Sequence, residues 1–273
     1  MGTLYVVGTP IGNMEDITLR ALRVLREVSL IAAEDTRTTG RLLQHHAVET
    51  PLISYHDFSD EQRLQELIER LHSADVALVS DAGMPGLSDP GYRLVQAAHE
   101  AGIPVSPIPG PSAAITALVS SGLPTDAFLF LGFLPRQAAA RRAALAEVRD
   151  LPYTLVLYEA PHRLLRLLAD VEAVLGDRRL VVARELTKLY EEIWRGTASA
   201  AQAHFGADRV RGEITLVIAG ASPGATVWDE AAVRDALREA IAAGQPRKQA
   251  AAAVAELSGW RKKELYELSL QLD

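Results

Sequence analysis

The chain contains no cysteine among its 273 residues, which excludes disulfides, thiol catalysis and zinc held by cysteine. No apolar run approaches the roughly 20 residues that a helix needs to span a bilayer. The first residues, MGTLYVVGTPIGN, lack the basic start and the long apolar core of a signal peptide. Together these absences predict a cytoplasmic protein that has no membrane segment.

Several familiar binding motifs are also missing. The chain has no GxGxxG fingerprint, no Walker loop and no HExxH pair, so a standard dinucleotide fold, a P-loop and a zinc protease have little support. Its seven histidines include the neighbours His45 and His46, but adjacent residues on a helix do not face one site. We therefore expect no metal site.

The composition is that of an ordinary globular protein, with 48% hydrophobic and 23% charged residues. The formal net charge is −7, which argues against nucleic-acid binding by the surface as a whole. A local basic face remains compatible with this charge.

Strand-like and helix-like patterns alternate through the first part of the chain. This alternation predicts an α/β domain, residues 1–121, whose parallel sheet is covered on both faces. The expected strands are 3–9, 30–33, 76–80 and 103–108, and the expected helices are 19–28, 64–71, 92–101 and 112–121.

A second α/β domain is expected over residues 122–221, after the boundary at Ser121-Gly122-Leu123-Pro124. Its expected strands are 128–133, 153–158, 180–183 and 214–219. A linker at 222–225 then leads to a helical module over 226–273. We expect Asp229 to cap the first helix of that module and Gly259 to end the second. Three short helices with tight turns resemble a helix-turn-helix.

The most informative segment is SDAGMPGLSDPG at 80–91, directly after an expected buried strand. Its glycines allow positive φ and close approach of another molecule, while its prolines stiffen the turn. Ligands of open α/β sheets bind beyond the carboxyl ends of strands, so this position predicts a ligand loop. A plain strand-to-helix connection is the alternative, although such connections usually need only about 2–6 residues.

Two further loops follow expected strands. The segment GTPIGN at 8–13 has glycines and exposed amides, and PGPSA at 109–113 places Ser112 at an expected helix start. Ser112 is equally well explained as a helix N-cap. Three such loops after three strands of one sheet would converge at one edge, which is a more specific signal than any one of them.

The chain resembles the ribosomal small-subunit RNA methyltransferase I family of the tetrapyrrole-methylase superfamily. The resemblance rests on GTPIGN, AEDTR, SDAGMPGLSDPG, PGPSA, EAPHR, ARELTK and GEIT, which occur in this order over nearly the whole chain. It implies an S-adenosylmethionine-dependent enzyme that methylates the ribose 2′-hydroxyl of a cytidine in the decoding region of 16S rRNA. It also implies a homodimer with the cofactor in a cleft between two α/β domains. The segment SYHDFSDEQR at 54–63 departs from the family pattern, and we assign it no role.

The resemblance implies a set of cofactor-binding residues drawn from all three loops and from the second domain. Small residues and exposed amides suit a folded cofactor, and aliphatic side chains can cover an adenine. The implied residues are Pro10, Asp81, Gly83, Met84, Ser112, Ala113, Tyr158, Ile214 and Thr215.

Methyl transfer to a 2′-hydroxyl is helped by positioning and by a general base or a stabilising cation. The candidates are Glu34, Asp35, Glu159, His162, Glu185 and Lys188, of which Glu34 and Lys188 are our choice as catalytic residues. Arg37 and Arg163 are candidates to hold RNA phosphates. Structural ion pairs are an equally good explanation of these cations, and His162 is equally well explained as a helix-start residue.

Basic residues gather in two segments. Four arginines follow Pro135 at positions 136, 141, 142 and 149, and the C-terminal module carries Arg247, Lys248, Arg261, Lys262 and Lys263. Local cation clusters on an acidic protein predict a directed phosphate footprint. Trp260 can stack on a base, but anchoring the third helix to its core is the better explanation.

Three functions therefore compete. The first is methylation of 16S rRNA or of the small ribosomal subunit. The second is adenosylmethionine-dependent methylation of a tetrapyrrole-type small molecule in the same cleft. The third is a non-catalytic ribosome-binding protein with a vestigial pocket. The basic C-terminal module and the AEDTR and EAPHR motifs favour RNA.

Overall fold

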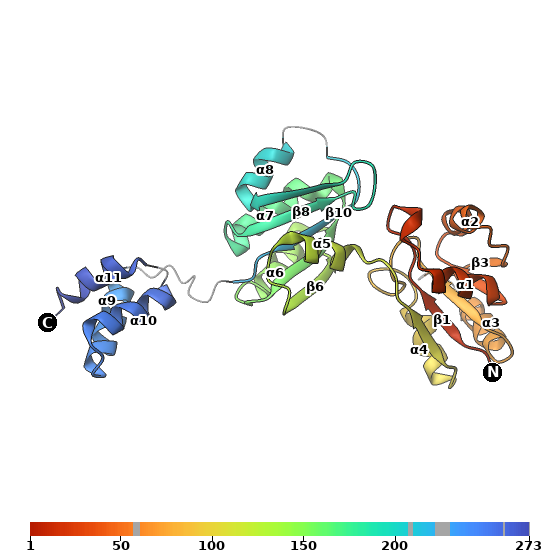
Figure 1. The fold of residues 1–273 in the computed structure, drawn as a ribbon, viewed down its shortest axis with the longest axis horizontal. Coiled ribbons are helices and arrows are strands. Elements are labelled where there is room, and N and C mark those ends of the chain that lie inside the picture. The colour runs from red at the N-terminus through yellow and green to blue at the C-terminus, as the bar shows by residue number, and fades with distance from the viewer. Residues whose placement is uncertain (57–60, 207–209, 222–229, 259, 273) are drawn as a thin grey trace. The chain divides into compact units, whose positions relative to one another are not determined.

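The computed structural model describes residues 1–56, 61–206, 210–221, 230–258 and 260–272. The expected linker at 222–225, the expected cap Asp229 and the expected helix end Gly259 lie outside the described residues. The chain forms two compact units, one of residues 1–147 with 154–219 and the other of residues 148–153 with 220–273 (Figure 1).

The first sheet of the larger unit is parallel throughout, in the strand order β3-β2-β4-β1-β5. Its two strands β2 and β4 are buried along their whole length, which explains their uninterrupted apolar sequences. The strands are β1 (Leu4–Val7), β2 (Leu30–Ala33), β3 (Leu52–Ser54), β4 (Val76–Val79) and β5 (Val105–Ile108).

Helices cover both faces of this sheet, as the alternating pattern predicted. Side chains alternate along each strand, so Ile31 and Ala33 join the core under α1 and α2, while Leu30 and Ala32 join the core under α3 and α4. The helices are α1 (Leu19–Glu27), α2 (Thr36–His45), α3 (Glu61–Leu71) and α4 (Tyr92–Glu100), and η1 (Met14–Asp16) is a short 3₁₀ turn.

The second sheet is mixed, in the order β6-β7-β10-β8-β9, and only its β6–β7 pair is parallel. Helix α5 (Ala113–Ser121), which follows the last strand of the first sheet, packs Ala114, Ala117 and Leu118 into the core of the second. The remaining elements of the unit are β6 (Phe128–Phe133), α6 (Ala138–Glu147), β7 (Thr154–Glu159), η2 (Pro161–Arg163), α7 (Leu164–Leu175), β8 (Arg179–Arg184), β9 (Glu192–Thr197), α8 (Ala198–Gly206) and β10 (Ile214–Ile218).

The smaller unit is helical in its C-terminal part, with α9 (Glu230–Ala242), α10 (Arg247–Ser258) and α11 (Lys262–Ser269). Val233, Leu237, Val254 and Leu265 form its buried core. Trp260 is half-buried against this core, as the packing explanation predicted. The two α/β sheets and this helical module confirm the predicted fold class. Among the described residues, no helix has both the length and the apolarity to cross a bilayer.

Arg141 was expected to belong to a basic cluster for RNA, and the structure corrects this. Its side chain is only 6% exposed and its Nε donates to Asp170 Oδ2 at 2.7 Å, so the guanidinium joins α6 to α7 inside the fold. Arg142 lies 3.9 Å from the other carboxylate oxygen of Asp170. The segment after Pro135 is therefore partly a structural ion-pair network.

Removing one partner of this buried pair should strongly destabilise the protein, because the remaining charge would be buried without a counter-ion. We expect Asp170→Ala to lower the free energy of unfolding by about 3 kcal/mol. Asp150→Ala is the control, since its carboxylate is 86% exposed beside Arg149 and should change the free energy by less than about 0.5 kcal/mol. Denaturant unfolding of both variants measures this, and equal losses would contradict the account.

Candidate functional site

Three loops leave the carboxyl ends of the neighbouring strands β4, β1 and β5 and meet at one edge of the first sheet. Thr9 N donates to Gly83 O at 2.9 Å and Gly83 N donates to Thr9 O at 3.1 Å, which joins the first two loops by an isolated bridge. The buried Thr9 hydroxyl donates to Ser80 O at 3.1 Å. The loops thus form one connected surface, in the arrangement predicted from their positions in the sequence.

The first and third loops touch backbone to backbone. A Cβ on Gly110 would lie 2.7 Å from Gly8 Cα, and a Cβ on Gly8 would lie 2.7 Å from both Gly110 Cα and Met84 Sδ. Only glycine at these two positions permits so close an approach. This contact fixes the spacing of the loops that line the site.

The loops and the second sheet enclose a mainly apolar cavity of 320 Å³. Phe130 and Phe133 meet the Tyr158 ring at 5.1 and 5.5 Å between centroids, and the Tyr158 hydroxyl accepts a hydrogen bond from Ala114 N at 3.3 Å. Seven of the residues predicted to bind a cofactor line this cavity: Gly83, Met84, Ser112, Ala113, Tyr158, Ile214 and Thr215. The sequence reasoning missed Phe133, whose only signal was an apolar residue at the end of a strand.

Two polar atoms at this cavity are buried without a hydrogen-bond partner among the described residues, namely Ser112 Oγ and Glu159 Oε2. The other oxygen of Glu159 accepts from Ala160 N at 2.7 Å and lies 3.0 Å from Arg163 Nε. Burial raises the pKa of Glu159, against the opposing effects of the Ala160 amide and the Arg163 charge. A buried hydrogen-bond acceptor that has no partner and faces a cavity indicates a ligand with a hydrogen-bond donor.

A second cavity of 200 Å³ adjoins the first, because Ile11, Ala82 and Glu213 line both. Pro10 and Asp81 line this second cavity rather than the larger one, although the resemblance implied that they lie beside the cofactor. The lining also includes Lys188, and Thr38 and Thr39 from the start of α2. Sequence reasoning missed helix α2, because its TRTTG start contains three threonines and a glycine, which have weak helix propensity.

Glu34 and Asp81 hold the ends of β2 and β4 together. Asp81 N donates to Glu34 Oε2 at 3.2 Å, and Asp35 N donates to Asp81 Oδ1 at 3.1 Å. Our choice of Glu34 as catalytic residue therefore falls on a carboxylate that positions the backbone of Asp81. Burial is the largest influence on Asp81 and raises its pKa.

Arg37 lies at the beginning of α2 with an 86% exposed side chain, and its Nη2 is 2.6 Å from Asp35 Oδ2. Hydrogen bonds from Arg37 lower the pKa of Asp35 to about 2, so Asp35 stays ionised. This exposed guanidinium remains our predicted phosphate contact beside the second cavity.

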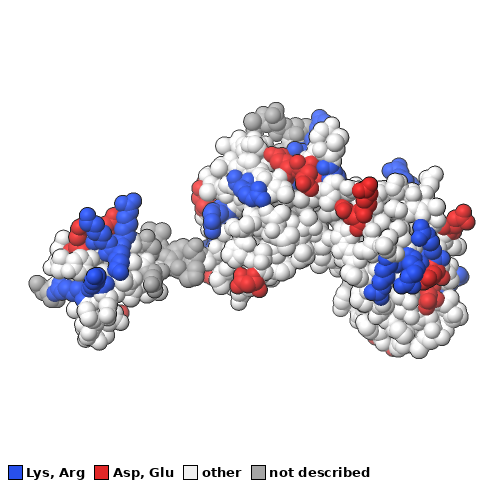
Figure 2. All heavy atoms as spheres, viewed as in Figure 1, with Lys and Arg blue, Asp and Glu red and all other residues white. Residues whose placement is uncertain are grey.

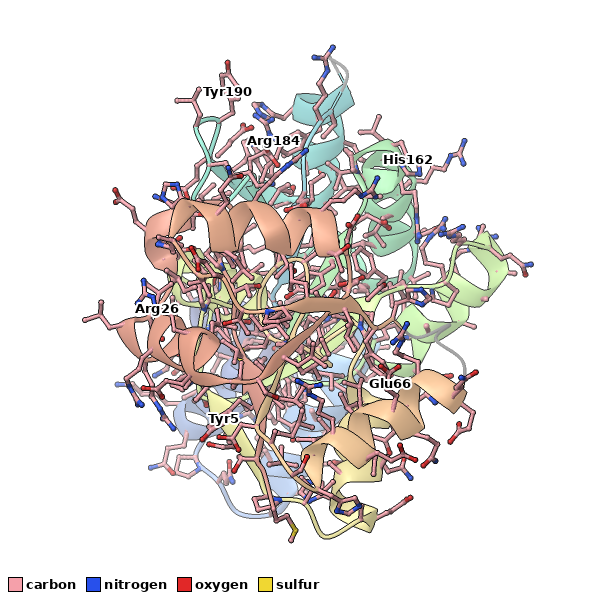
Figure 3. The ribbon with its side chains drawn as sticks, turned by 90° about the vertical axis from the view of Figure 1, so that its right-hand side faces the viewer. Tyr5, Arg26, Glu66, His162, Arg184 and Tyr190 are labelled. Atoms are coloured by element: carbon pink, nitrogen blue, oxygen red, sulfur yellow. The ribbon has the colours of Figure 1, made fainter. Side chains whose placement is uncertain are left out.

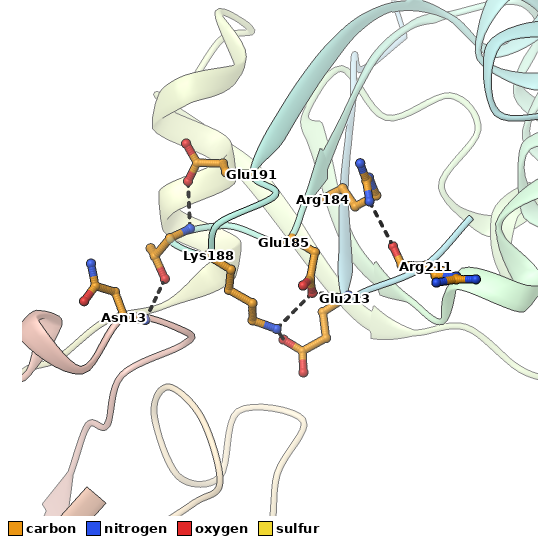
Figure 4. Close-up of polar contacts among 8 residues, drawn as sticks. Asn13, Arg184, Glu185, Lys188, Glu191, Arg211 and Glu213 are labelled. Carbon is orange, nitrogen blue, oxygen red and sulfur yellow. Dashed lines mark hydrogen bonds and ion pairs between the residues drawn. The ribbon is translucent and has the colours of Figure 1, made fainter. Parts of the chain in front are cut away.

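Lys188 lies in a loop between β8 and β9 and joins two carboxylates (Figure 4). Its Nζ is 2.9 Å from Glu185 Oε1 and 2.9 Å from Glu213 Oε2. Burial alone would lower the pKa of Lys188, but the hydrogen bonds and charges of Glu213 and Glu185 outweigh this and raise it. Lys188 is therefore held between two carboxylates at the second cavity, which favours the role of a cation over that of a base.

The loop that carries Lys188 is held tightly against the first α/β half. Thr187 has a φ of +66° and its Oγ1 accepts from Asn13 N at 3.1 Å. A Cβ on Gly12 would lie 2.5 Å from Lys188 Cγ. Beyond these contacts the loop projects outward, and Tyr190 is 71% exposed (Figure 3).

The predicted RNA contacts fall into different environments. Arg163 is largely internal, since its side chain is 15% exposed, pairs with Glu159 and donates to Leu134 O at 2.8 Å. His162 beside it is exposed at the molecular surface (Figure 3). Arg163 therefore supports the EAPHR turn, which favours the structural explanation over a phosphate contact.

In the C-terminal helical module, Lys248, Lys262 and Lys263 are exposed, and the visible face of this module shows more Lys and Arg surface than Asp and Glu surface (Figure 2). Arg247 donates from its Nη1 to Ser269 O, so part of its function is to tie α10 to the end of α11. Within the described ranges, no group of three or more His, Asp or Glu side chains is placed to hold a metal ion.

The fold and the site define a methylase. The sequence profile of the tetrapyrrole (corrin/porphyrin) methylases matches residues 3–202, and a profile described as the RsmI C-terminal HTH domain matches residues 229–273. Two solved structures share the fold over 80% of this chain and 94% of their own. They are uroporphyrin-III-C-methyltransferase from Thermus thermophilus (TM-score 0.54, 23% identity) and a cobalamin biosynthetic enzyme, cobalt precorrin-4 methyltransferase (TM-score 0.59, 14% identity).

Relatives that carry a curated name narrow the class of methylase to which the chain belongs. Proteins named ribosomal RNA small subunit methyltransferase I match this chain at 51% identity in Synechocystis (100% of this chain, 99% of the relative) and 49% in Pseudomonas aeruginosa (99% and 97%). The Escherichia coli O157:H7 relative is 48% identical over 99% of this chain and 95% of its own. The chain belongs to this family of methyltransferases, within the tetrapyrrole methylases, which confirms the resemblance found in the sequence.

The raised pKa of Glu159 has a consequence for stability. Between the unfolded and folded pKa values the folded state keeps a proton that the unfolded state releases, so stability falls as pH rises through that interval. Glu159→Gln imitates the protonated form of the side chain. The stability of this variant should therefore lack the decrease with rising pH that Glu159 causes. We compare the free energy of unfolding of the wild type with that of Glu159→Gln. The difference, wild type minus variant, should decrease as pH rises from 4 upward. Its slope should be at most about 1.4 kcal/mol per pH unit.

Denaturant unfolding at a series of pH values measures this difference. Glu147→Gln, at the exposed end of α6, is the control and should follow the wild type at every pH. A difference between the wild type and Glu159→Gln that stays constant with pH would contradict the assignment.

Proposed function

We propose that this chain transfers the methyl group of S-adenosylmethionine to the ribose 2′-hydroxyl of a cytidine in the decoding region of 16S rRNA. The observation that carries the proposal is the agreement between sequence and site. Seven of the residues that the family resemblance implied for the cofactor line one cavity, in a chain about half identical to proteins named ribosomal RNA small subunit methyltransferase I.

The larger cavity fits adenosylmethionine. Its apolar walls, among them Met84, Leu87 and Ile214, suit an adenine, and the unpartnered Ser112 Oγ and Glu159 Oε2 offer acceptors for the hydroxyl and amino donors of an adenosyl group. Bound adenosylmethionine supplies an electrophilic methyl group on a positively charged sulfur.

RNA as the acceptor is supported by exposed cations outside the two cavities. Arg37 is exposed at the start of the helix that lines the second cavity, and Lys248, Lys262 and Lys263 are exposed on the C-terminal module, to which the RsmI C-terminal HTH profile matches. We propose that the protein works in the cytoplasm, where ribosomal subunits assemble. A homodimer is also proposed, and the exposed Leu189 and Tyr190 offer apolar surface to a second copy.

The test uses purified protein, methyl-labelled adenosylmethionine and small ribosomal subunits from cells that lack this enzyme. Nuclease digestion and mass spectrometry then locate the label. We expect 2′-O-methylcytidine in the decoding region of 16S rRNA. Label in a tetrapyrrole precursor but none in RNA would establish the small-molecule function in place of this one, and cofactor binding without any turnover would favour a non-catalytic ribosome-binding protein.

The Gly8–Gly110 contact should control cofactor affinity, because a side chain there would push apart two loops of the cofactor cavity. We expect Gly110→Ala to weaken adenosylmethionine binding about tenfold, since overpacking costs roughly 1–3 kcal/mol. Gly206→Ala is the control, because a Cβ there meets nothing within 4 Å. Calorimetric titration compares the two variants, and equal affinities would refute this placement.

Phosphate contacts by the C-terminal module should appear in the salt dependence of RNA binding. Replacing Lys248, Lys262 and Lys263 together by alanine should weaken binding and make the slope of log affinity against log salt shallower by about 2–3, since each lost phosphate contact removes about 0.7–0.9. Replacing the exposed Arg20, Arg23 and Arg26 of α1 removes the same charge and is the control. Equal slopes for both triple variants would mean that net charge, rather than this module, governs binding.

A further inference from the structure

The second cavity is lined by Pro10 and Asp81, which the family resemblance placed beside the cofactor, but by none of the seven predicted cofactor residues that line the first cavity. Its lining includes the charged side chains of Asp81 and Lys188 and the hydroxyl-bearing residues Thr38 and Thr39. The two cavities share Ile11, Ala82 and Glu213, so a group in one lies beside a group in the other. A transfer reaction requires two such adjoining compartments, one for the donor and one for the acceptor.

The charges of the second cavity argue against its being filled by the amino-acid end of the donor. That end carries a carboxylate beside its ammonium group, and among the described residues no cation in this lining is left without an anionic partner to hold the carboxylate. The lining offers Asp81 and Glu213 as anions, and its one lysine already lies 2.9 Å from two carboxylate oxygens. A neutral polar group that donates hydrogen bonds suits this cavity better.

The size of the cavity agrees with an acceptor of one nucleoside unit. Its 200 Å³ is too small for a duplex or for a run of stacked bases. Enzymes that act on a single nucleotide take it out of the stack into a pocket of its own. Arg37, exposed at the start of the same helix that supplies Thr38 and Thr39, is placed for a flanking phosphate.

We propose that the second cavity receives the acceptor ribose and that the carboxylate of Asp81 takes up the proton of its 2′-hydroxyl. This inference rests on the proposed function and deepens it. Among the described residues, the one hydrogen bond to the Asp81 carboxylate comes from Asp35 N to Oδ1, which leaves Oδ2 for a ligand. Glu34 contributes by holding the Asp81 amide, and thus acts as a positioning residue.

The step balances without a further reagent. The 2′-oxygen forms a bond to the methyl carbon, the bond from that carbon to sulfur breaks, and its electron pair remains on sulfur. The hydroxyl proton passes to Asp81 and then to water.

A proton acceptor at Asp81 implies loss of activity at low pH. The charged groups around it are Glu34, Asp35 and Arg37 at the end of β2 and the start of α2, with Lys188 and Glu213 across the cavity. Burial raises the pKa of Asp81, and the Asp35 charge adds to this, while the Asp35 amide and Arg37 oppose it. The active, ionised form is therefore present at high pH and is lost as pH falls through this raised value.

The first test blocks the cavity. Thr38→Phe adds bulk at the cavity wall, and Arg41→Phe adds the same ring at an exposed position of α2 outside the cavity lining. We expect Thr38→Phe to lower the rate of label transfer to small subunits about 100-fold with adenosylmethionine affinity within twofold of the wild type. Arg41→Phe should keep the wild-type rate. Equal rates for both variants, or loss of adenosylmethionine binding in Thr38→Phe, would overturn the assignment of this cavity to the acceptor.

The second test removes the proton acceptor. Asp81→Asn keeps an oxygen for the Asp35 amide, so the loop should stay in place and bind adenosylmethionine as before. We expect kcat to fall about 100-fold, the lower end of what a general base contributes, and the acidic limb of the pH profile to disappear. A retained acidic limb, or a loss confined to adenosylmethionine affinity, would show that Asp81 is structural. Failure of the proposed function itself would appear differently, as a wild-type enzyme that leaves RNA unlabelled.

Discussion

The contact between Gly8 and Gly110 is the constraint on which the site depends. Two loops meet there with no side chain between them, and a Cβ on either glycine would come within 2.7 Å of the other backbone. The Thr9–Gly83 bridge then adds the third loop, so the ends of β4, β1 and β5 form one wall. Helix α5 begins directly after Gly110-Pro111-Ser112 and packs into the second sheet, which ties this wall to the other half of the larger unit.

Two adjoining cavities lie around that wall. The larger one carries two buried acceptors without partners among the described residues, and the smaller one has Asp81, Lys188 and Glu213 in its lining. The cations near this site each lie beside a carboxylate. Lys188 lies between Glu185 and Glu213, Arg37 lies against Asp35, and the ends of two strands exchange hydrogen bonds through Glu34 and Asp81. Few charges are left to move, which favours a site that is organised before its ligands bind.

Much of this could be predicted from the sequence. The buried strands β2 and β4 show as continuous apolar runs, and glycines and prolines mark the three loops. The edge strands β3 and β9 could not be predicted, because LIS is only three residues long and EIWRGT lacks an apolar run. Contacts between residues far apart in the sequence could not be predicted either. Only coordinates show that Arg141 is buried against Asp170, that Lys188 is held by Glu213, and that Asp81 lines a different cavity from Met84.

The most direct test of the account is a crystal structure of the protein with bound adenosylmethionine. We predict that the adenosyl group fills the larger cavity and that the sulfonium methyl group lies at the junction of Ile11, Ala82 and Glu213, directed toward Asp81 Oδ2. A cofactor whose amino-acid end fills the second cavity, with its methyl group directed away from Asp81, would contradict the division into donor and acceptor compartments.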